Sequence, residues 1–423
     1  MHCDPRFSRV QEVFERHFAD GEELGAAFAV YLDGELVVDL WGGVADRHTG
    51  RAWREDTPAY AYSCTKAITA TVLLQLTERG LVDVDAPVAE VWPEFAAQGK
   101  ETITVAQLLT HEAGLPALEE PVPVSEFEDQ PAIADRLARQ RPLWEPGTAH
   151  GYHALTYGFL VGEVVRRVTG KSVGELVAAE IAGPLGLDMC LGASDPVIAR
   201  AARLSSGEPR TASPTGAVPG ARPANPDGGA GDSTGSGAGG GGGGGAAGGV
   251  GEALGGLAEA RGDVFTRMAR AAQDPESLMN RALGNPRMQS LDGGANNPVI
   301  LRAGWPAAGL VTTATGLAGF YRSLIAGDVL RPETLRDAVR PRVNGPDRVL
   351  YVDSSFGLGY MRPSMTFFVP SVTAFGHTGF GGFLGLGDEE RGLAVGYVMN
   401  KMANAVSGSL RAFRLTEAVY QAL

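Results

Sequence analysis

The chain has 423 residues, of which 44% are apolar and 20% charged, and its formal net charge is −13 at pH 7. These values are ordinary for a globular protein with a large core, and the length suits two packed domains. The negative charge argues against a nucleic-acid partner, whose phosphates require clustered Lys and Arg, and against adsorption to an anionic membrane.

The cysteines and the N-terminal residues indicate the compartment. Cys3, Cys64 and Cys190 form no CxxC pair and are too few for a disulfide framework, which favours a reducing environment. The N-terminal residues contain no basic segment followed by an apolar run, and no window approaches the roughly 18 apolar residues of a membrane span. We therefore expect a cytoplasmic protein, and the sequence leaves its oligomeric state open.

The first elements predicted are a helix and a hairpin. The helix is amphipathic, and its apolar face would consist of Phe7, Val10, Val13, Phe14 and Phe18. After it come GAAFAVYL at 25–32 and ELVVDLWGG at 35–43, two runs rich in β-forming residues. Asp33-Gly34 joins them and tolerates the positive φ that a tight turn requires, so the pattern predicts a β-hairpin.

Helices are predicted for most of the next stretch. A helical pattern covers 62–79 and ends at Gly80, a residue type common just after helix C-termini. Residues 84–200 also have mainly helical patterns, of which LLTHEAGL and YHALTYGFLVGEVVRRVTG are the clearest.

The composition changes abruptly after that. Residues 211–256 are dominated by Gly, Pro, Ser and Ala and bury too little apolar area to offset their chain entropy, which predicts a disordered surface insertion. Ordered structure is predicted to resume at 263–273, and a buried strand is predicted at 391–400 and a closing amphipathic helix at 410–423.

This order of elements predicts an α/β domain built from both ends of the chain and interrupted by a helical domain. The sheet domain would comprise 1–58 and 290–423. The helical domain would comprise 59–210 and 257–289, apart from the insertion.

A candidate catalytic pair lies at the start of the helix predicted at 62–79. Ser63 and Lys66 are three residues apart, which puts both side chains on one helix face. A serine hydroxyl needs a base, and a lysine can serve where its surroundings favour the neutral amine. Near a helix N-terminus the Ser63 N–H is also free to stabilise an oxyanion. The SxxK spacing is short and common by chance, so the pair alone does not establish a site.

Several segments around this pair resemble the superfamily of serine β-lactamases and penicillin-binding proteins, especially the branch of class C β-lactamase-like proteins and family VIII esterases. SxxK is a signature of that superfamily. The resemblance implies the β-lactamase/transpeptidase-like fold, in which an antiparallel sheet flanked by helices adjoins an all-helical domain with the site between them. The segments span nearly the whole chain outside the insertion: DGELVVDLWGGVADRHTGRAW, YSCTKAITA, LLTHEAGLP, PGTAHGYHALTYGFLVGEVV, FGHTGFGGFLG and GYVMNKM.

Tyr152-His153-Ala154 matches the second motif of that superfamily. The resemblance implies that Tyr152 is catalytic: as a phenolate beside a lysinium it would take the Ser63 proton and return it to the leaving alcohol. The alternative is that Tyr152 only packs at a helix start. We expect His150 and His153 to form pocket walls, with His153 among the substrate-contacting residues.

His377-Thr378-Gly379 stands where the superfamily has Lys-Thr-Gly on a strand lining the site. The resemblance implies that these three residues contact the substrate. It also implies that the backbone N–H of Phe380 joins that of Ser63 as the second oxyanion donor, and the neighbouring glycines permit a close backbone approach.

Two departures from the superfamily pattern favour an esterase. His377 is mostly neutral at pH 7, whereas a lysine would attract a substrate carboxylate as a permanent cation. Ala154 replaces an Asn that contacts the lysine and the substrate amide, and its side chain cannot hydrogen-bond. We therefore expect a serine carboxylesterase for short acyl esters. A β-lactamase, or a D-amino-acid peptidase or amidase, is the alternative of the same chemistry, and a non-catalytic scaffold is the alternative of another class.

Three other patterns are interpreted as coincidence. GxSxG at 231–235 lies in the insertion, and the P-loop-like end at 170–172 lacks the first glycine. His111-Glu112 begins like HExxH, but Leu115 occupies the place of the second histidine. We expect no metal and no cofactor, and we interpret Cys64 as a packing residue.

Overall fold

The computed structural model describes residues 1–206, 266–268 and 270–423. Nearly all of them belong to one compact unit, Met1–Gly207 with Arg267–Leu423. The segment 211–256, predicted to be a disordered insertion, lies outside the described residues. The division of the remainder into a sheet domain and a helical domain stays a prediction.

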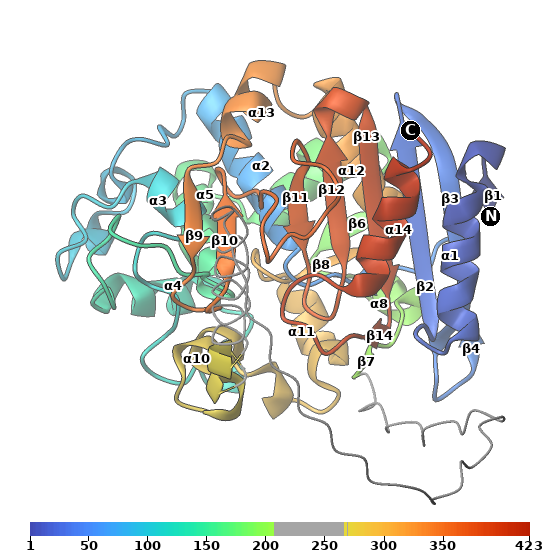
Figure 1. The fold of residues 1–423 in the computed structure, drawn as a ribbon. Coiled ribbons are helices and arrows are strands. Elements are labelled where there is room, and N and C mark those ends of the chain that lie inside the picture. The colour runs from blue at the N-terminus through green and yellow to red at the C-terminus, as the bar shows by residue number, and fades with distance from the viewer. Residues whose placement is uncertain (207–265, 269) are drawn as a thin grey trace, which may run out of the picture. The chain divides into compact units, whose positions relative to one another are not determined.

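The main sheet has the strand order β1-β3-β2-β13-β12-β11, with β4 paired to β3 (Figure 1). All of its pairings are antiparallel. The predicted hairpin is confirmed as β2 and β3, with Asp33 and Gly34 at φ of 50° and 87° in the turn. The strands are β1 (His2–Cys3), β2 (Gly25–Leu32), β3 (Glu35–Asp46), β4 (Arg51–Ala52), β11 (Phe375–Thr378), β12 (Leu384–Asp388) and β13 (Leu393–Met399).

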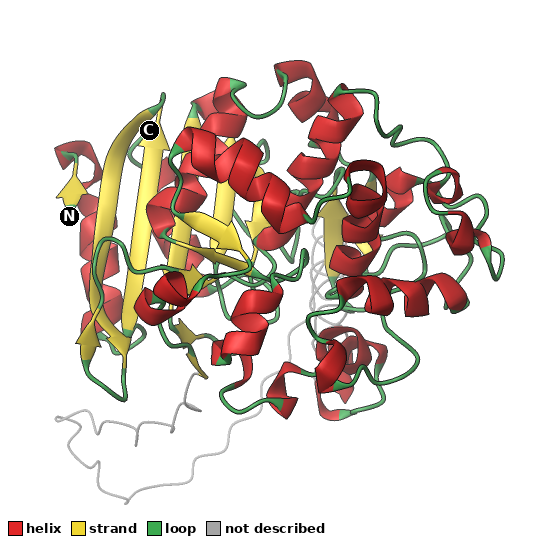
Figure 2. Cartoon of the chain, turned by 180° about the vertical axis from the view of Figure 1, so that it is seen from behind, coloured by secondary structure: helices red, strands yellow, loops and turns green. Residues whose placement is uncertain are grey.

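The two ends of the chain build this sheet together. The strand predicted at 391–400 is confirmed as β13, which pairs with β2 from Leu393 opposite Leu32 to Met399 opposite Ala26. The helices α1 (Ser8–Ala19) and α14 (Leu410–Tyr420) pack together over one face of the sheet (Figure 1). The other face is covered by α12 (Ala314–Ala326), which packs on β2, β12 and β13 (Figure 2).

Helices and short strands make up the rest of the described chain. Helices are the main regular structure of residues 84–200, and the helix expected in YHALTYGFLVGEVVRRVTG is confirmed at Thr156–Thr169. The helix expected in LLTHEAGL is wrong beyond its first two residues, because the helix there ends at Leu109 and His111 adopts a φ of 64°. Within the segment 263–273, residues 266–268 and 270–273 are helical. The remaining helices are α2 (Thr65–Glu78), α3 (Val105–Leu109), α4 (Gln130–Arg139), α5 (Thr156–Thr169), α6 (Val173–Leu176), α7 (Gly183–Leu185), α8 (Asp195–Arg200), α10 (Leu278–Gly284), α11 (Pro298–Ala303) and α13 (Pro332–Ala338). Three small sheets pair β5 (Ala59–Tyr60), β8 (Leu310–Thr312) and β6 (Met189–Leu191); β9 (Val343–Pro346) and β10 (Asp353–Phe356); and β7 (Ser205–Ser206) with β14 (Lys401–Met402).

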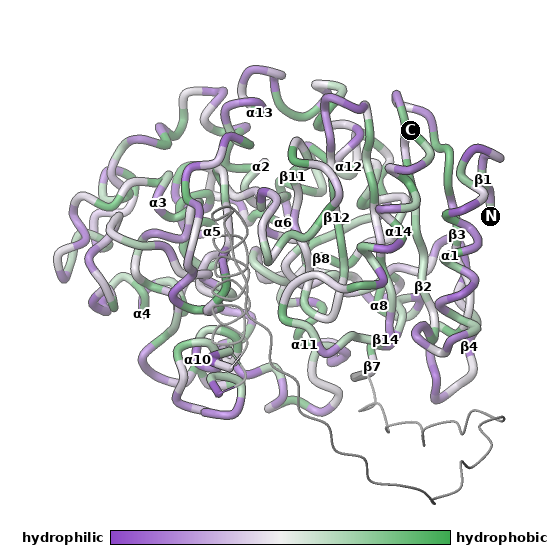
Figure 3. Tube along the Cα trace, in the orientation of Figure 1, coloured by the Kyte–Doolittle hydropathy of each residue, from purple (hydrophilic) through white to green (hydrophobic). Residues whose placement is uncertain are grey.

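The helix that carries Lys66 lies in the interior. All residues of α2 from Thr65 to Leu76 are buried, and the helix packs against α5 and β11. Apolar residues occur on every side of it, as a helix surrounded by protein requires, and its buried polar side chains include that of Lys66. Figure 3 shows the contrast with α1, whose surface alternates between polar and apolar residues. Gly80 follows the helix with φ of 69°, as predicted, but the helix begins at Thr65, three residues later than expected.

No helix among the described residues combines the length and the apolar character needed to cross a membrane.

Candidate active site

Ser63 lies in the turn between β5 and α2, and Lys66 lies in the first turn of α2. The chain reverses just before the serine, where Tyr62 adopts φ of 46°. This left-handed conformation is uncommon for a residue with a Cβ, and such strain concentrates at functional sites. Lys66 Nζ lies 3.1 Å from Ser63 Oγ. The spacing of three thus brings the two groups into hydrogen-bonding contact.

The Lys66 amine is held by two backbone carbonyls. Nζ donates to Ala154 O at 2.7 Å and to Ala307 O at 3.0 Å, and the side chain is fully buried. Burial lowers the pKa of Lys66 well below its usual value. A neutral amine has two N–H donors and one lone pair. When the amine is neutral, the two carbonyls take both of its donors, and its lone pair is left to accept the proton of Ser63 Oγ.

Tyr152 lies beside this pair. The Lys66 amine is 4.7 Å from the centre of the Tyr152 ring. Burial raises the pKa of Tyr152, although an interaction of its hydroxyl with the Ser63 side chain opposes the rise. The Tyr152 phenol is therefore protonated near neutral pH. This differs from the phenolate beside a lysinium expected from the sequence, because burial disfavours both charged forms.

Two backbone N–H groups remain available for an oxyanion. Gly379, Gly381 and Gly382 each donate their N–H to a backbone carbonyl. Among the hydrogen bonds of the described residues, neither Ser63 nor Phe380 donates its backbone N–H. An oxyanion hole needs two such unengaged donors.

The segments that carry these donors lie against each other. A Cβ on Gly379 would come within 2.4 Å of Ala61 O, so only glycine permits this approach. Cys64 Sγ donates to His377 O at 3.4 Å, and the rings of Tyr62 and Phe380 are 5.6 Å apart.

The third motif places a neutral histidine in the site. The His377 ring is fully buried, and its Nδ1–H donates to Thr378 O at 2.7 Å. Nε2 is therefore the unprotonated nitrogen, and it has no hydrogen-bond partner among the described residues. Burial lowers the pKa of His377 to about 3. The hydroxyl of Thr378 is 2.6 Å from Ser407 Oγ.

His153, expected to contact the substrate, is instead engaged on both sides of its ring. It is fully buried; Nδ1 donates to Gly151 O at 2.6 Å and Nε2 accepts from Leu115 N at 2.9 Å. Its backbone N–H donates to His111 Nδ1 at 3.1 Å. A direct contact between a His153 ring nitrogen and a substrate would require one of these bonds to break.

Sequence reasoning missed two contributors. The carbonyl of Ala307 holds Lys66, but a backbone carbonyl has no signal in residue identity. His111 was considered only as part of an incomplete zinc motif, and its neighbours in the sequence give no sign of its place beside Tyr152; the two rings are 5.0 Å apart. Burial raises the pKa of the Cys64 thiol, which agrees with packing rather than nucleophilic chemistry.

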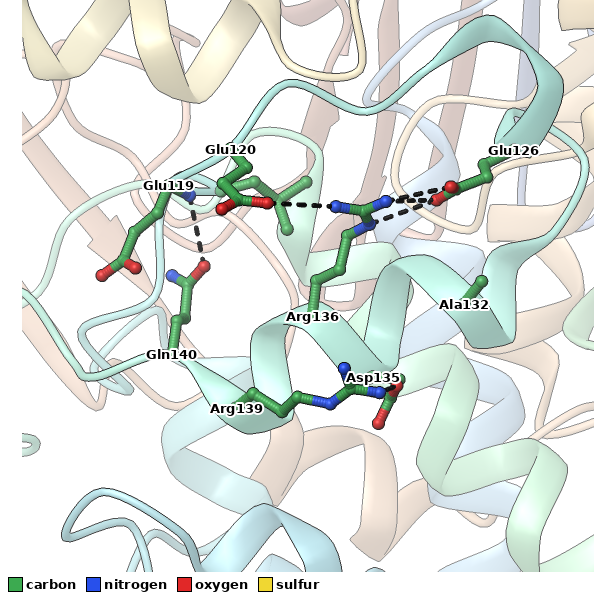
Figure 4. Close-up of a pocket in the computed structure, with 9 residues that line it drawn as sticks. Glu119, Glu120, Glu126, Ala132, Asp135, Arg136, Arg139 and Gln140 are labelled. Atoms are coloured by element: carbon green, nitrogen blue, oxygen red, sulfur yellow. Dashed lines mark hydrogen bonds and ion pairs between the residues drawn. The ribbon is translucent and has the colours of Figure 1, made fainter.

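A separate hollow of about 480 Å³ lies beside α4 and contains none of the residues above (Figure 4). Its arginines are paired: Arg136 lies 2.9 Å from Glu126 and 3.6 Å from Glu120, and Arg139 pairs with Asp135. No cluster of three His, Cys, Asp or Glu in the described part of the chain could hold a metal ion.

The fold, together with the buried Lys66 and Tyr152 beside the partly exposed Ser63, defines the class of serine acyl-transfer enzymes with a β-lactamase/transpeptidase-like fold. The family model named Beta-lactamase matches residues 10–420, and the chain belongs to that family.

Relatives span the whole chain. "Esterase/beta-lactamase LipL" of Mycobacterium tuberculosis is 33% identical over 413 residues, which cover 95% of this chain and 82% of that protein. The crystal structure of a family VIII carboxylesterase superposes with a TM-score of 0.80 at 32% identity and covers 100% of this chain and 99% of that one. A penicillin-binding protein homologue from Caulobacter crescentus has a TM-score of 0.79 at 33% identity, with 100% and 99% covered. The family, the fold and the serine-hydrolase class predicted from the sequence are confirmed.

Proposed function

We propose that this protein is a carboxylesterase that cleaves short-chain esters through an acyl-enzyme on Ser63. The observation that carries the proposal is the Lys66 amine, which is fully buried, held by two carbonyls and 3.1 Å from Ser63 Oγ. The names of the relatives support ester hydrolysis, since the mycobacterial protein is called an esterase and a solved structure is that of a carboxylesterase.

Acylation would proceed through a tetrahedral intermediate. The neutral Lys66 amine takes the proton of Ser63 Oγ as the oxygen attacks the ester carbonyl. The oxyanion is stabilised by the N–H groups of Ser63 and Phe380. As the intermediate collapses, the Tyr152 phenol gives its proton to the leaving alcohol and regains one from the Lys66 ammonium. One proton has then moved from Ser63 to the alcohol, and Lys66 is neutral again.

Deacylation would run the same path with water in place of the alcohol. Lys66, through Tyr152, takes a proton from the water as it attacks the acyl carbonyl. The intermediate collapses when Ser63 Oγ leaves and recovers its proton. The products are the acid and free enzyme, and the steps require no cofactor.

The third motif supports an ester over a β-lactam or a D-amino-acid peptide. With its pKa lowered to about 3, His377 carries no charge at neutral pH and offers no cation to a substrate carboxylate. At Ala154 only the carbonyl is available, and Lys66 occupies it. A β-lactamase remains the second candidate because the mycobacterial relative carries both activities in its name.

The remaining parts of the proposal concern the surroundings of the enzyme. We propose a small-molecule ester as the partner of the site and the cytoplasm as its location. The three cysteines are free thiols, which supports a reducing compartment.

The test compares the wild-type protein with Ser63→Ala on p-nitrophenyl acetate, p-nitrophenyl butyrate and a chromogenic cephalosporin. We expect ester turnover in the wild type, none above background in the variant, and a butyryl adduct on the Ser63 peptide by mass spectrometry. Equal rates in both proteins would refute the nucleophile and favour a non-catalytic scaffold. Cephalosporin turnover far above ester turnover would favour the second candidate.

A further inference from the structure

A buried carboxylate lies behind the Tyr152 loop and has no role in the chemistry described above. Asp347 follows β9 and is 2% exposed. Burial raises the pKa of the Asp347 carboxyl, which hydrogen bonds from three backbone N–H groups and the nearby His150 oppose, and no lysine or arginine in the described part of the chain forms an ion pair with it. A carboxylate in such a place is costly unless hydrogen bonds satisfy its oxygens.

Four groups donate to the Asp347 carboxylate. Tyr152 N–H lies 3.1 Å from both oxygens. The N–H groups of Val349 and Leu350, in the turn that Asp347 begins, donate to Oδ1 at 2.8 and 2.9 Å. Ser354 Oγ donates to Oδ2 at 2.9 Å. The carboxylate thus joins the turn between β9 and β10, orange in Figure 1, to a loop 195 residues earlier in the chain.

The network continues to His150. Its Nε2 lies 2.9 Å from Ser354 Oγ. Because the single Ser354 proton goes to Asp347, Nε2–H of His150 must be the donor in this contact. His150 also accepts at its carbonyl from Arg348 N at 3.2 Å.

The loop around Tyr152 depends on such contacts because it belongs to no helix or strand. Its backbone is held at three successive N–H groups: Gly151 N donates to His111 O at 3.0 Å, Tyr152 N to Asp347, and His153 N to His111 Nδ1 at 3.1 Å. On the β10 side, the Phe356 ring stacks on the Tyr152 ring at 6.1 Å and 12°.

We propose that Asp347 is a positioning residue, which holds the Tyr152 backbone so that the phenol reaches both Ser63 Oγ and the leaving group. The proposal deepens, and rests on, the proposed role of Tyr152. The effect of Asp347 on catalysis is geometric. Its negative charge raises the pKa of Tyr152, as burial does, and so would not help the phenol to ionise.

The alternative is that Asp347 serves only the turn between β9 and β10. The variant Asp347→Asn separates the two roles. An asparagine oxygen still accepts from Val349 and Leu350 and so preserves the turn. Its amide nitrogen takes the place of Oδ2 and puts a donor against both Tyr152 N–H and Ser354 Oγ, so Tyr152 N–H keeps only the oxygen at the Oδ1 position as acceptor and is pushed away from the amide nitrogen.

We expect Asp347→Asn to lower kcat on p-nitrophenyl butyrate about tenfold to a hundredfold, as for an ångström-scale misplacement of a catalytic group. KM and the melting temperature should change little. Ser354→Ala, which leaves the bond to Tyr152 intact, is the matched control and should lower kcat less than about threefold.

A double-mutant cycle with Tyr152→Phe decides whether Asp347 acts through the phenol. Once the hydroxyl is gone, Asp347→Asn should cost no further activity, so the double variant should match Tyr152→Phe. If the double variant instead loses activity by the product of the two single-variant losses, the positioning role is overturned. A wild-type kcat in Asp347→Asn would overturn it as well. Wild-type activity in Tyr152→Phe alone would instead refute the proposed role of Tyr152. If Asp347→Asn does not fold, Asp347→Ser replaces it in the same cycle, because a serine can still hydrogen-bond within the turn but is too short to reach Tyr152.

Discussion

Replacing Lys66 with methionine removes the proposed base and keeps an unbranched side chain of similar length. General-base catalysis contributes about 10²- to 10⁴-fold, so we expect kcat on p-nitrophenyl butyrate to fall by that factor, or about 3–5 kcal/mol in activation free energy. The same change leaves Ala154 O and Ala307 O without their donor, at about 1–3 kcal/mol each. The variant also no longer pays the desolvation cost of burying the amine, and this offsets part of the loss of stability.

The chain offers a matched control for that variant. Lys100 is also fully buried, and its Nζ also donates to two backbone carbonyls, Ala97 O and Gln140 O, each at 2.6 Å. No serine hydroxyl accepts from it. Lys100→Met should therefore lower the melting temperature about as much as Lys66→Met and leave kcat near that of the wild type.

The release of p-nitrophenol gives kcat, and differential scanning fluorimetry gives the melting temperature. Activity is measured well below the melting temperatures of both lysine variants. A Lys66→Met protein that keeps more than about a tenth of kcat would refute the assignment of Lys66 as base. So would a Lys100→Met protein that loses as much activity as Lys66→Met, because the loss would then follow from unpaired carbonyls.

Two further predictions follow from the site. Gly379→Ala should lower kcat at least tenfold with a modest change in KM, because its Cβ would lie 2.4 Å from Ala61 O and push Phe380 N–H away from the oxyanion; an unchanged kcat would contradict this. For pH, burial lowers the pKa of both His153 and His377 to about 3 from 6.5. His17 adds to this effect because burial lowers its pKa to about 4, whereas Glu23 opposes it because burial raises its pKa to about 7. The three histidines outnumber the glutamate, so the unfolded chain binds more protons below pH 6.5 and the free energy of unfolding in urea should fall from pH 6.5 towards pH 4; a free energy that rises over this range would contradict the burial of the rings.

Much of the fold could be predicted because it depends on local patterns. Two runs rich in β-forming residues, joined by Asp33-Gly34, predicted the hairpin, and the helical pattern ending at Gly80 predicted α2. The start of that helix was placed three residues early, because Tyr62 takes a left-handed φ that the helical pattern does not indicate. A conformation imposed by neighbouring elements has no local signature.

By itself, the sequence determined which groups the site contains: the serine and lysine spaced three apart, the tyrosine, and the family to which they belong. Only the tertiary structure decided how those groups are charged and held. Lys66 meets carbonyls 88 and 241 residues away, and Tyr152 meets a carboxylate 195 residues away. Backbone carbonyls are identical at every residue, and burial arises from elements distant in the chain. The pKa values of Lys66, Tyr152 and His377 therefore depend on packing that no local pattern contains.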